Sequence, residues 1–366
     1  MKKRVLRILC AAIAALLLAL PLASCGAKDA VMTYEGYSFN TNFYTYWLSS
    51  FKANFLYSYY DVVDTEEYFD SVISDDGKTA DQVMTEMSDD IIKTYLVAEY
   101  FCDKYGISPT ENMLKAIDEQ LERILTEQAD GSKNAFNAIA AEYGINYKML
   151  REIYIIEAKA ELFYRFYAQN FLTPTLTDDM RSEYCKNNYA KCDFIYVSTQ
   201  YRYNTNEEGK FVFDENGSYL IDLTEEEKKD KQSKISELAA KLNESNFDSL
   251  RKEYNEDPSA DEYKNGYYFS FNMEYNESVL TAAQLMDEGE IRRVDTDYGV
   301  YFLRKHQTEG DAYSKEENAD FFTDFDTLLV QYLFDKMMAE ETAKVVINEE
   351  NKKGISIKTV SPCSYF

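Results

Sequence analysis

Scarcity of glycine and proline is the feature that most restricts what this chain can fold into. The 366 residues include 13 glycines and 5 prolines, whereas sheets joined by many tight turns, and glycine-rich phosphate loops, need more glycine. Hydrophobic residues make up 45% and charged residues 28% of the chain. Because both values are ordinary for globular proteins, we expect a folded protein with long helices rather than a disordered chain.

The charge balance argues against a nucleic-acid partner. There are 39 lysines and arginines against 65 aspartates and glutamates, which gives a net charge of −26. A protein that neutralises phosphates along DNA or RNA needs the opposite sign. We interpret the negative charge as a feature that favours solubility. Recruitment of positively charged client proteins or of divalent ions is a weaker alternative.

The first 25 residues have the pattern of an export signal. A basic start precedes an apolar run over residues 8–22, which is short for a membrane span. The run ends in Leu22-Ala23-Ser24-Cys25-Gly26, which resembles the lipobox of bacterial lipoproteins, where the signal is cut before the cysteine and the thiol receives lipid. This resemblance implies a signal peptide over residues 1–24, lipidation of Cys25 and a tether over 25–30. An ordinary secretory signal with an incidental Cys25 is the alternative.

Residues 40–188 have the pattern of connected helices. Phe43, Trp47 and Phe51 recur at close to helical spacing, so they predict one aromatic stripe. A helix over residues 81–105 is expected to end at Gly106, and Ser108 is expected to cap the next helix, with Pro109 at its first position.

The last helix of this region is predicted from a capping sequence. Thr177 is followed by two aspartates, which predicts a short helix that ends near Asn188. The alternating segment 31–39, ahead of all these helices, is expected to be a strand or a hairpin arm.

The pattern changes at Lys191. Strand-like runs cover residues 194–197, 267–271, 291–294 and 300–303. Helical patterns lie between them, at 224–242, 247–254 and 279–286. The helix at 224–242 is expected to start from a capping box of Thr224 and Glu227. Strands and helices in this order predict a compact α+β domain.

Residues 192–305 resemble a parvulin domain, the peptidyl-prolyl isomerase module. The matching segments are 192–197, 247–250, 257–260, 266–271, Gly289-Glu290-Ile291 and 296–302, the last of which begins Thr296-Asp297-Tyr298-Gly299. The flanking parts resemble the PrsA and SurA type of extracytoplasmic folding factors, in which a helical chaperone domain precedes the parvulin domain and is completed by a C-terminal helix.

This resemblance implies a mainly α protein with an α+β domain. The helical chaperone domain would cover residues 31–188, the parvulin-like domain 189–307, and the C-terminal helix and strand that complete the chaperone domain 308–366. The helix, at about 318–346, is expected to pack on the N-terminal helices. The strand, over 355–360, is a candidate to pair with residues 31–39.

The resemblance also implies the site residues. Active parvulins usually carry one histidine on the first strand and another on the last, and this chain has Phe194 and Tyr301 there. The loop position that is usually Cys or Asp is matched best by Asp257, so Asp257 and Tyr301 are the catalytic candidates. The candidates for the prolyl pocket are Phe194, Met273, Val279 and Leu280. The only histidine, His306, is interpreted as a surface residue.

Loss of both histidines leaves isomerase activity open. Rotation about an Xaa-Pro bond has a barrier of about 18–20 kcal/mol, and it falls when a site favours the twisted amide. No nucleophile or cofactor is required, so an apolar pocket with the hydroxyl of Tyr301 or the carboxylate of Asp257 could assist. A parvulin-shaped binding domain without catalysis is the alternative.

No cofactor and no metal site are expected. Four cysteines remain beyond Cys25, at positions 102, 185, 192 and 363, without the close spacing of metal ligands. A disulfide is permitted outside the cytoplasm, but the sequence does not pair them.

The predicted function is that of a lipid-anchored folding factor on the outer face of a bacterial cell membrane. Its partners would be unfolded or secreted polypeptides, and a homodimer stays open. The alternative is a surface lipoprotein that binds one dedicated partner on a non-catalytic parvulin scaffold. A solute-binding lipoprotein is disfavoured, because residues 40–188 show no alternation of strands and helices.

Overall fold

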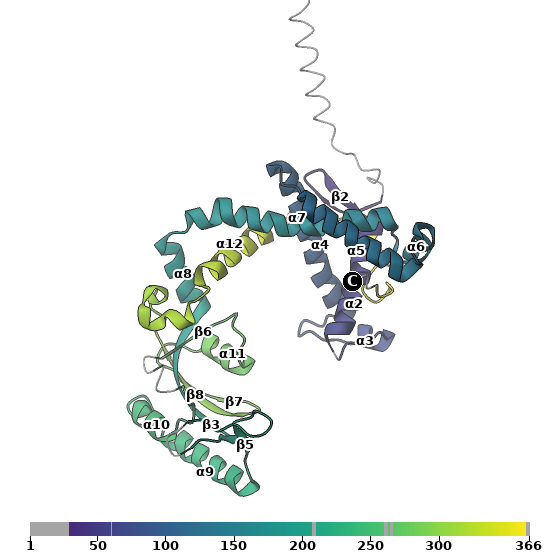
Figure 1. The fold of residues 1–366 in the computed structure, drawn as a ribbon. Helices are drawn as coiled ribbons and strands as arrows, with labels where there is room; N and C mark the ends of the chain where they lie inside the picture. Colours follow the sequence, from purple (N-terminus) through teal and green to yellow (C-terminus); the bar gives the residue numbers. More distant parts are fainter. Residues whose placement is uncertain (1–28, 60, 207–209, 260–262, 264–265, 364–366) are drawn as a thin grey trace, which may run out of the picture. The chain divides into compact units, whose positions relative to one another are not determined.

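The computed structural model describes residues 29–59, 61–206, 210–259, 263 and 266–363. It divides into two compact units: Thr175–Leu329 forms unit 2, and the segments on either side of it form unit 1 (Figure 1). Unit 1 is helical and is built from both ends of the chain, whereas unit 2 combines helices with a sheet. The predicted fold class is therefore confirmed. The predicted domain boundaries are at 188/189 and 307/308, while the units meet at 174/175 and 329/330.

Six helices form the N-terminal part of unit 1. They are α2 (Thr41–Ser58), α3 (Glu66–Asp70), α4 (Ala80–Tyr105), α5 (Glu111–Ala129), α6 (Lys133–Ala140) and α7 (Tyr147–Tyr167). The start of α4 is fixed by a capping box between Thr79 and Gln82, and its end by Gly106 in the left-handed conformation, as predicted. Among the described residues, no helix is both long and apolar enough to cross a membrane.

The predicted cap of α5 was wrong by two residues. Thr110, not Ser108, has the extended backbone of a cap, and its Oγ1 accepts a hydrogen bond from the backbone N–H of Met113 at 3.3 Å. A hydroxyl at this position reaches the third helical N–H. Pro109 therefore precedes the cap instead of opening the helix.

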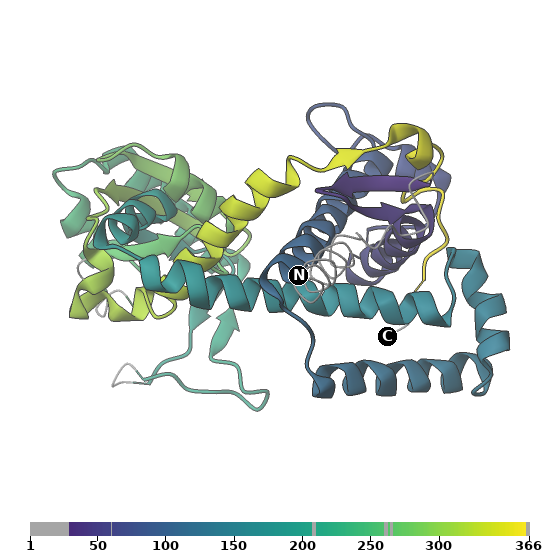
Figure 2. The same cartoon turned by 90° about the horizontal axis from the view of Figure 1, so that it is seen from above.

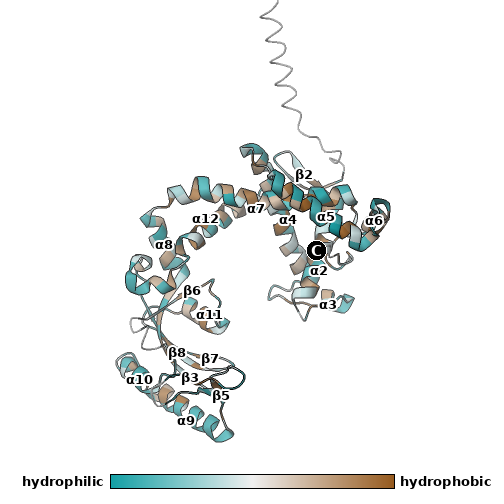
Figure 3. Ribbon diagram, in the orientation of Figure 1, coloured by the Kyte–Doolittle hydropathy of each residue, from teal (hydrophilic) through white to brown (hydrophobic). Residues whose placement is uncertain are grey.

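Aromatic side chains fill the core of unit 1. The predicted stripe on α2 is present, with the Trp47 ring 4.7 Å from Phe39 and 5.3 Å from Tyr95 of α4, measured between centroids. Helices α4 and α7 pack together through Phe101 and Phe163, whose rings stack at 5.1 Å. Hydrophobic and hydrophilic residues alternate along α7 (Figure 3), as expected for a helix with one buried stripe.

The C-terminal residues complete this core. Helix α12 (Phe325–Thr342) contributes Phe334 and Met338, which are buried with the N-terminal residues. The ring centroid of Phe334 lies 5.0 Å from that of Tyr164 on α7. Strand β9 (Val346–Ile347) then pairs with β1 (Ala30–Tyr34), which itself pairs with β2 (Tyr37–Asn40), so both ends of the chain share one small sheet (Figure 2).

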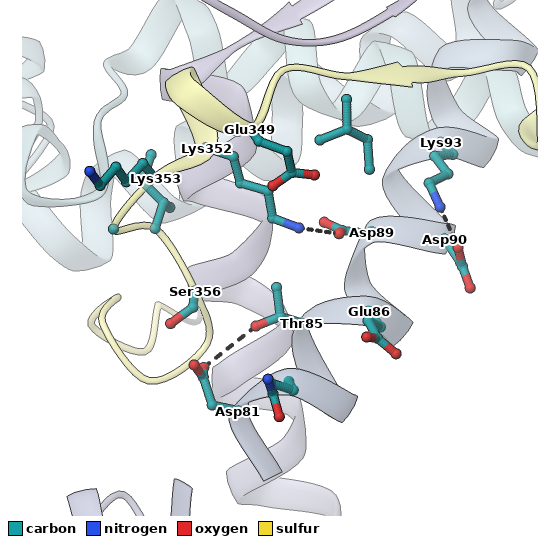
Figure 4. Close-up of a pocket in the computed structure, with 14 residues that line it drawn as sticks. Asp81, Thr85, Glu86, Asp89, Asp90, Lys93, Glu349, Lys352, Lys353 and Ser356 are labelled. Carbon is teal, nitrogen blue, oxygen red and sulfur yellow. Dashed lines mark hydrogen bonds and ion pairs between the residues drawn. The ribbon is translucent and has the colours of Figure 1, made fainter. Parts of the chain in front are cut away.

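The predicted strand at 355–360 was wrong, since residues 346–347 provide the pairing instead. Two backbone N–H groups of the tail bond to side chains of α4: Ile357 donates to Thr85 Oγ1 at 3.0 Å, and Lys358 donates to Asp81 Oδ1 at 2.7 Å. A segment whose donors are satisfied in this way needs no strand partner. Upstream of it, in the short helix α13 (Glu349–Lys352), Lys352 reaches the buried carboxylate of Asp89 (Figure 4).

Unit 2 is built around a four-stranded antiparallel sheet with the order β6-β3-β8-β7. Its strands are β3 (Tyr189–Ser198), β6 (Tyr267–Ser270), β7 (Ile291–Asp295) and β8 (Gly299–His306), and its helices are α8 (Asp178–Asn188), α9 (Glu225–Lys241), α10 (Phe247–Tyr254) and α11 (Glu277–Leu285). Each of these elements matches a predicted one. The predicted caps of α8 at Thr177 and of α9 at Thr224 are both formed.

Alternate residues of β3 serve two separate cores. Phe194 and Tyr196 pack on the side of the sheet that α11 covers, whereas Ile195 and Val197 pack with residues of α9 and α10 on the other side. The two-residue period of a strand explains this division. A further antiparallel pair, β4 (Tyr201–Tyr203) with β5 (Leu220–Asp222), lies between the predicted strand at 194–197 and the predicted helix at 224–242, where no element was predicted.

Unit 1 contains a carboxyl group that titrates near neutrality. Glu157 of α7 accepts a hydrogen bond from Trp47 Nε1 at 2.9 Å. Burial raises the pKa of its carboxyl to about 7, and the hydrogen bond from Trp47 acts in the opposite direction without cancelling that effect. Burial also raises the pKa of the neighbouring phenol of Tyr95, and the charge of Glu157 adds to the increase.

This shift makes stability depend on pH in a defined direction. The pKa rises from an ordinary 4.5 to about 7 in the folded chain. Between these two values the folded state holds more protons than the unfolded state, so stability falls as the pH rises through that window. A shift of this size corresponds to at most about 3 kcal/mol.

We predict that Glu157→Gln removes most of this pH dependence. The glutamine oxygen still accepts the Trp47 N–H but carries no charge to bury, so the variant should be more stable than the parent at pH 8, by up to about 3 kcal/mol, and similar to it at pH 5. Urea unfolding followed by the fluorescence of Trp47, the only tryptophan, measures this difference. Glu152→Gln, an exposed position on the same helix, should keep the dependence of the parent. Equal stability of parent and Glu157→Gln at pH 8 would contradict the assignment.

Candidate functional site

The residues proposed for the prolyl pocket lie in one cluster of unit 2. Phe194 of β3, Met273 in the turn after β6, and Val279 and Leu280 of α11 pack together with Tyr301 of β8. Phe194 is 4% exposed and Val279 is fully buried, so these two form the floor of the cluster. Met273, Leu280 and Tyr301 are partly exposed, so a ligand could contact these three directly.

The two positions that the resemblance assigns to histidines are neighbours. The ring centroids of Phe194 and Tyr301 lie 5.6 Å apart, with their planes inclined at 61° to each other. The register of β3 and β8 explains this, because Tyr301 pairs directly with Tyr196, two residues along the strand from Phe194 and on the same face. Both substituted residues are aromatic, so the pair is a ring contact and not a hydrogen-bonded couple.

Phenol groups take the polar positions of this site. Tyr275 donates to the hydroxyl of Tyr301 at 3.4 Å, and the hydroxyls of Tyr196 and Tyr201 are 3.0 Å apart. The rings of Tyr196 and Tyr301 lie 4.7 Å apart. Tyr196, Tyr201 and Tyr275 were not among the site residues predicted from the sequence. The alternation of β3 could have identified Tyr196, which shares a face with Phe194. Tyr201 lies in the short separate strand β4 and Tyr275 in the turn after β6, and neither gave such a signal.

The phenols stay protonated at neutral pH. Burial raises the pKa of Tyr301, and the nearby phenol of Tyr275 raises it further. Burial likewise raises the pKa of Tyr275 to about 12. A neutral phenol donates one hydrogen bond. Since the Tyr301 oxygen accepts from Tyr275, and its own proton has no acceptor among the described residues, Tyr301 can donate to a ligand.

Asp257 is held beside this site by backbone pairing with β3. The preceding residue, Glu256, donates its N–H to the carbonyl of Tyr196 at 2.8 Å, and the side chain of Asn255 accepts the N–H of Tyr196 at 2.8 Å. Oδ1 of Asp257 accepts from both the N–H and the hydroxyl of Ser259, at 2.9 and 2.7 Å. No hydrogen bond joins Asp257 to Tyr301 in the described part of the chain, but the charge of Asp257 contributes to the raised pKa of Tyr301.

The interpretation of His306 as a surface residue was incomplete. Its side chain is 35% exposed, and Nε2 lies 2.8 Å from Oδ2 of Asp193. Asp193 is buried on the opposite face of the sheet from Tyr301, where Arg251 and Arg304 also pair with it. Burial alone would raise the pKa of Asp193, but hydrogen bonds from His306 and Arg304 outweigh it and lower the pKa to about 2. His306 therefore belongs to an ion network that fixes α10 against the sheet.

Throughout the described ranges, no three His, Cys, Asp or Glu side chains are grouped so that they could hold a metal ion. The cysteines at 102, 185, 192 and 363 are all buried. Cys25, the predicted lipidation site, lies outside the described residues.

Comparison with known proteins finds similarity at the level of solved structures. No family model and no curated protein match the chain. The structure of PrsA from Bacillus subtilis is 22% identical, covers 73% of this chain and 93% of its own, and has a TM-score of 0.23. The foldase protein PrsA from Streptococcus pneumoniae is 14% identical over 79% of this chain and 99% of its own, with a TM-score of 0.22.

The peptidylprolyl isomerase PrsA from Bacillus cereus is also similar, with 14% identity over 76% of this chain and 92% of its own and a TM-score of 0.25. The solved structures to which this chain is similar thus include PrsA proteins, the type of folding factor that the sequence resembles.

Proposed function

We propose that this chain is a membrane-anchored extracytoplasmic folding factor of the PrsA and SurA type, which holds unfolded or secreted polypeptides. The observation that carries the proposal is the arrangement of unit 2. The two positions matched to the parvulin histidines, Phe194 and Tyr301, contact each other, and the residues matched to the prolyl pocket pack around them. This contact between residues more than 100 positions apart in sequence supports the proposal.

The anchor belongs to the same proposal. Lipidation of Cys25 would hold the protein on the outer face of a bacterial cell membrane, with acyl chains that each contribute about 0.8 kcal/mol per buried CH₂. Removal of residues 1–24 would take away four basic and no acidic side chains, and the net charge of −30 that remains (35 − 65) would keep the folded part away from anionic lipid. A monomer and a homodimer are both compatible with this arrangement.

Unit 1 offers exposed apolar and aromatic side chains for an unfolded client. Tyr57 is 91% exposed and Val72 is 62% exposed. Aromatic rings with a polar tip bind many unrelated apolar segments at low entropic cost. We assign the holding function to this surface.

We predict that the full-length chain delays aggregation of several unrelated unfolded proteins, and that Tyr57→Ser combined with Val72→Ser weakens this protection. Light scattering during dilution of three chemically unfolded clients measures the effect. Leu285→Ser, at a 68% exposed position of unit 2, is the matched control and should retain full protection. Protection of a single client would favour the alternative of a dedicated binding partner, and protection of none would contradict the proposal.

Weak prolyl isomerisation is the second activity that we propose for unit 2. It is favoured by the protonated hydroxyl of Tyr301 at the open side of the apolar cluster. A donor at this position can bond to the prolyl nitrogen of a twisted Xaa-Pro amide more strongly in the transition state than in the ground state, because loss of resonance frees the lone pair of that nitrogen. Asp257 is assigned a secondary role, because its carboxylate already accepts two bonds from Ser259.

We predict that Tyr301→Phe slows catalysed cis/trans exchange of an Xaa-Pro peptide by about tenfold, since one hydrogen bond contributes about 1.4 kcal/mol. Magnetisation-exchange NMR with and without the full-length chain gives the rate. Tyr298→Phe, a 61% exposed position just before the same strand, should leave the rate unchanged. Equal rates for Tyr301→Phe and the parent would remove Tyr301 from the mechanism, and a parent without acceleration would be a holding chaperone only.

A further inference from the structure

A cavity of about 290 Å³ lies in unit 2 between β6 and the helical turn that precedes α12. Tyr267 and Tyr268 of β6 line it on one side, and Phe321 lines it on the other. The Phe321 ring lies 4.7 Å from that of Tyr267 and 5.7 Å from that of Tyr268. This volume is at the lower limit of ligand pockets, so it suits a single side chain.

Two carboxylates stand at this aromatic cavity. Asp320 and Asp324 belong to its lining and are both exposed. Neither side chain forms an ion pair or a hydrogen bond with any residue of the described ranges. Two uncompensated negative charges beside aromatic rings favour a cationic occupant, because the faces of the rings also attract cations.

The chain already places one of its own cations against the same group of rings. Lys191 Nζ lies 5.4 Å from the centroid of Tyr268, but its charge is paired with Glu309 at 3.1 Å. Tyr268 also donates to Glu309 at 2.8 Å. Lys191 therefore does not neutralise Asp320 or Asp324, and neither carboxylate is paired with another residue of the described ranges.

We propose that this cavity binds the guanidinium group of an arginine in a client polypeptide. The planar guanidinium stacks on aromatic faces and donates paired hydrogen bonds to carboxylates, which matches this combination of groups. Met273 lines the cavity and also belongs to the prolyl cluster, so the arginine would lie on the same client segment as the residue held by that cluster. This inference rests on the proposed function and specifies the client: an extended segment that carries a positive charge.

The test compares two peptides that differ only in charge. A short unstructured peptide with one arginine next to an Xaa-Pro pair is titrated into the full-length chain, and the same peptide with citrulline, a neutral analogue of the same shape, is the reference. We expect the arginine peptide to bind about tenfold more tightly, with a difference that shrinks as salt is added. Equal affinities for the two peptides would overturn the proposal.

Variants test whether the cavity causes the preference for the arginine peptide. Asp320→Asn with Asp324→Asn should abolish the preference for arginine, and Phe321→Leu, which keeps an apolar side chain but removes the ring, should reduce it. Glu226→Gln with Asp230→Asn makes the same change of net charge on exposed positions of α9 and should preserve the preference. If that control loses the preference too, the attraction is a property of the whole acidic chain and the cavity is not its site.

The aggregation measurement separates the two proposals. Variants at Asp320 and Asp324 that lose the arginine preference should still protect clients without exposed cationic segments. If the chain protects clients from aggregation but binds both peptides with equal affinity, the arginine site is contradicted and the folding function is not. A chain that protects no client and binds neither peptide would contradict both.

Discussion

The antiparallel pairing of β3 with β8 is the interaction on which unit 2 depends. It joins residues 191–198 to 299–306 through eight successive residue pairs, and these segments are separated by about 100 positions in the chain. Because side chains alternate along both strands, one ladder supplies the aromatic cluster on the face covered by α11 and the apolar core under α9 and α10. A slip of one residue would exchange these faces and separate Phe194 from Tyr301.

Unit 1 depends on a different constraint, the return of the C-terminal segment. Strand β9 adds to the N-terminal hairpin, and the buried ammonium of Lys52 donates to the carbonyl of Val360 at 2.9 Å while pairing with Asp64 at 2.6 Å. A buried charge is tolerated only when it is paired and hydrogen-bonded. The tail is thus part of the core of unit 1 and not an appendage, although the α+β unit interrupts it in sequence.

The sequence predicted the elements well where local chemistry decides. Capping residues such as Thr177 and Thr224 and the stop at Gly106 are read from single positions, and the alternation around Phe194 identifies a strand. The prediction from sequence failed where contacts with distant residues decide the local conformation. Residues 355–360 have the composition of a strand, but side chains of α4 take their backbone donors. Tyr275 enters the site through the turn after β6, which carries no periodic signal.

The proposed function requires that the chain recognises polypeptides because they are unfolded. The most direct measurement is fluorescence anisotropy of one labelled client, titrated with the full-length chain first as a permanently unfolded variant and then as its folded parent. We expect the anisotropy to rise and saturate with the unfolded form and to stay unchanged with the folded form. Equal binding of both forms, or binding of the folded form alone, would contradict it and indicate a receptor for one structured partner.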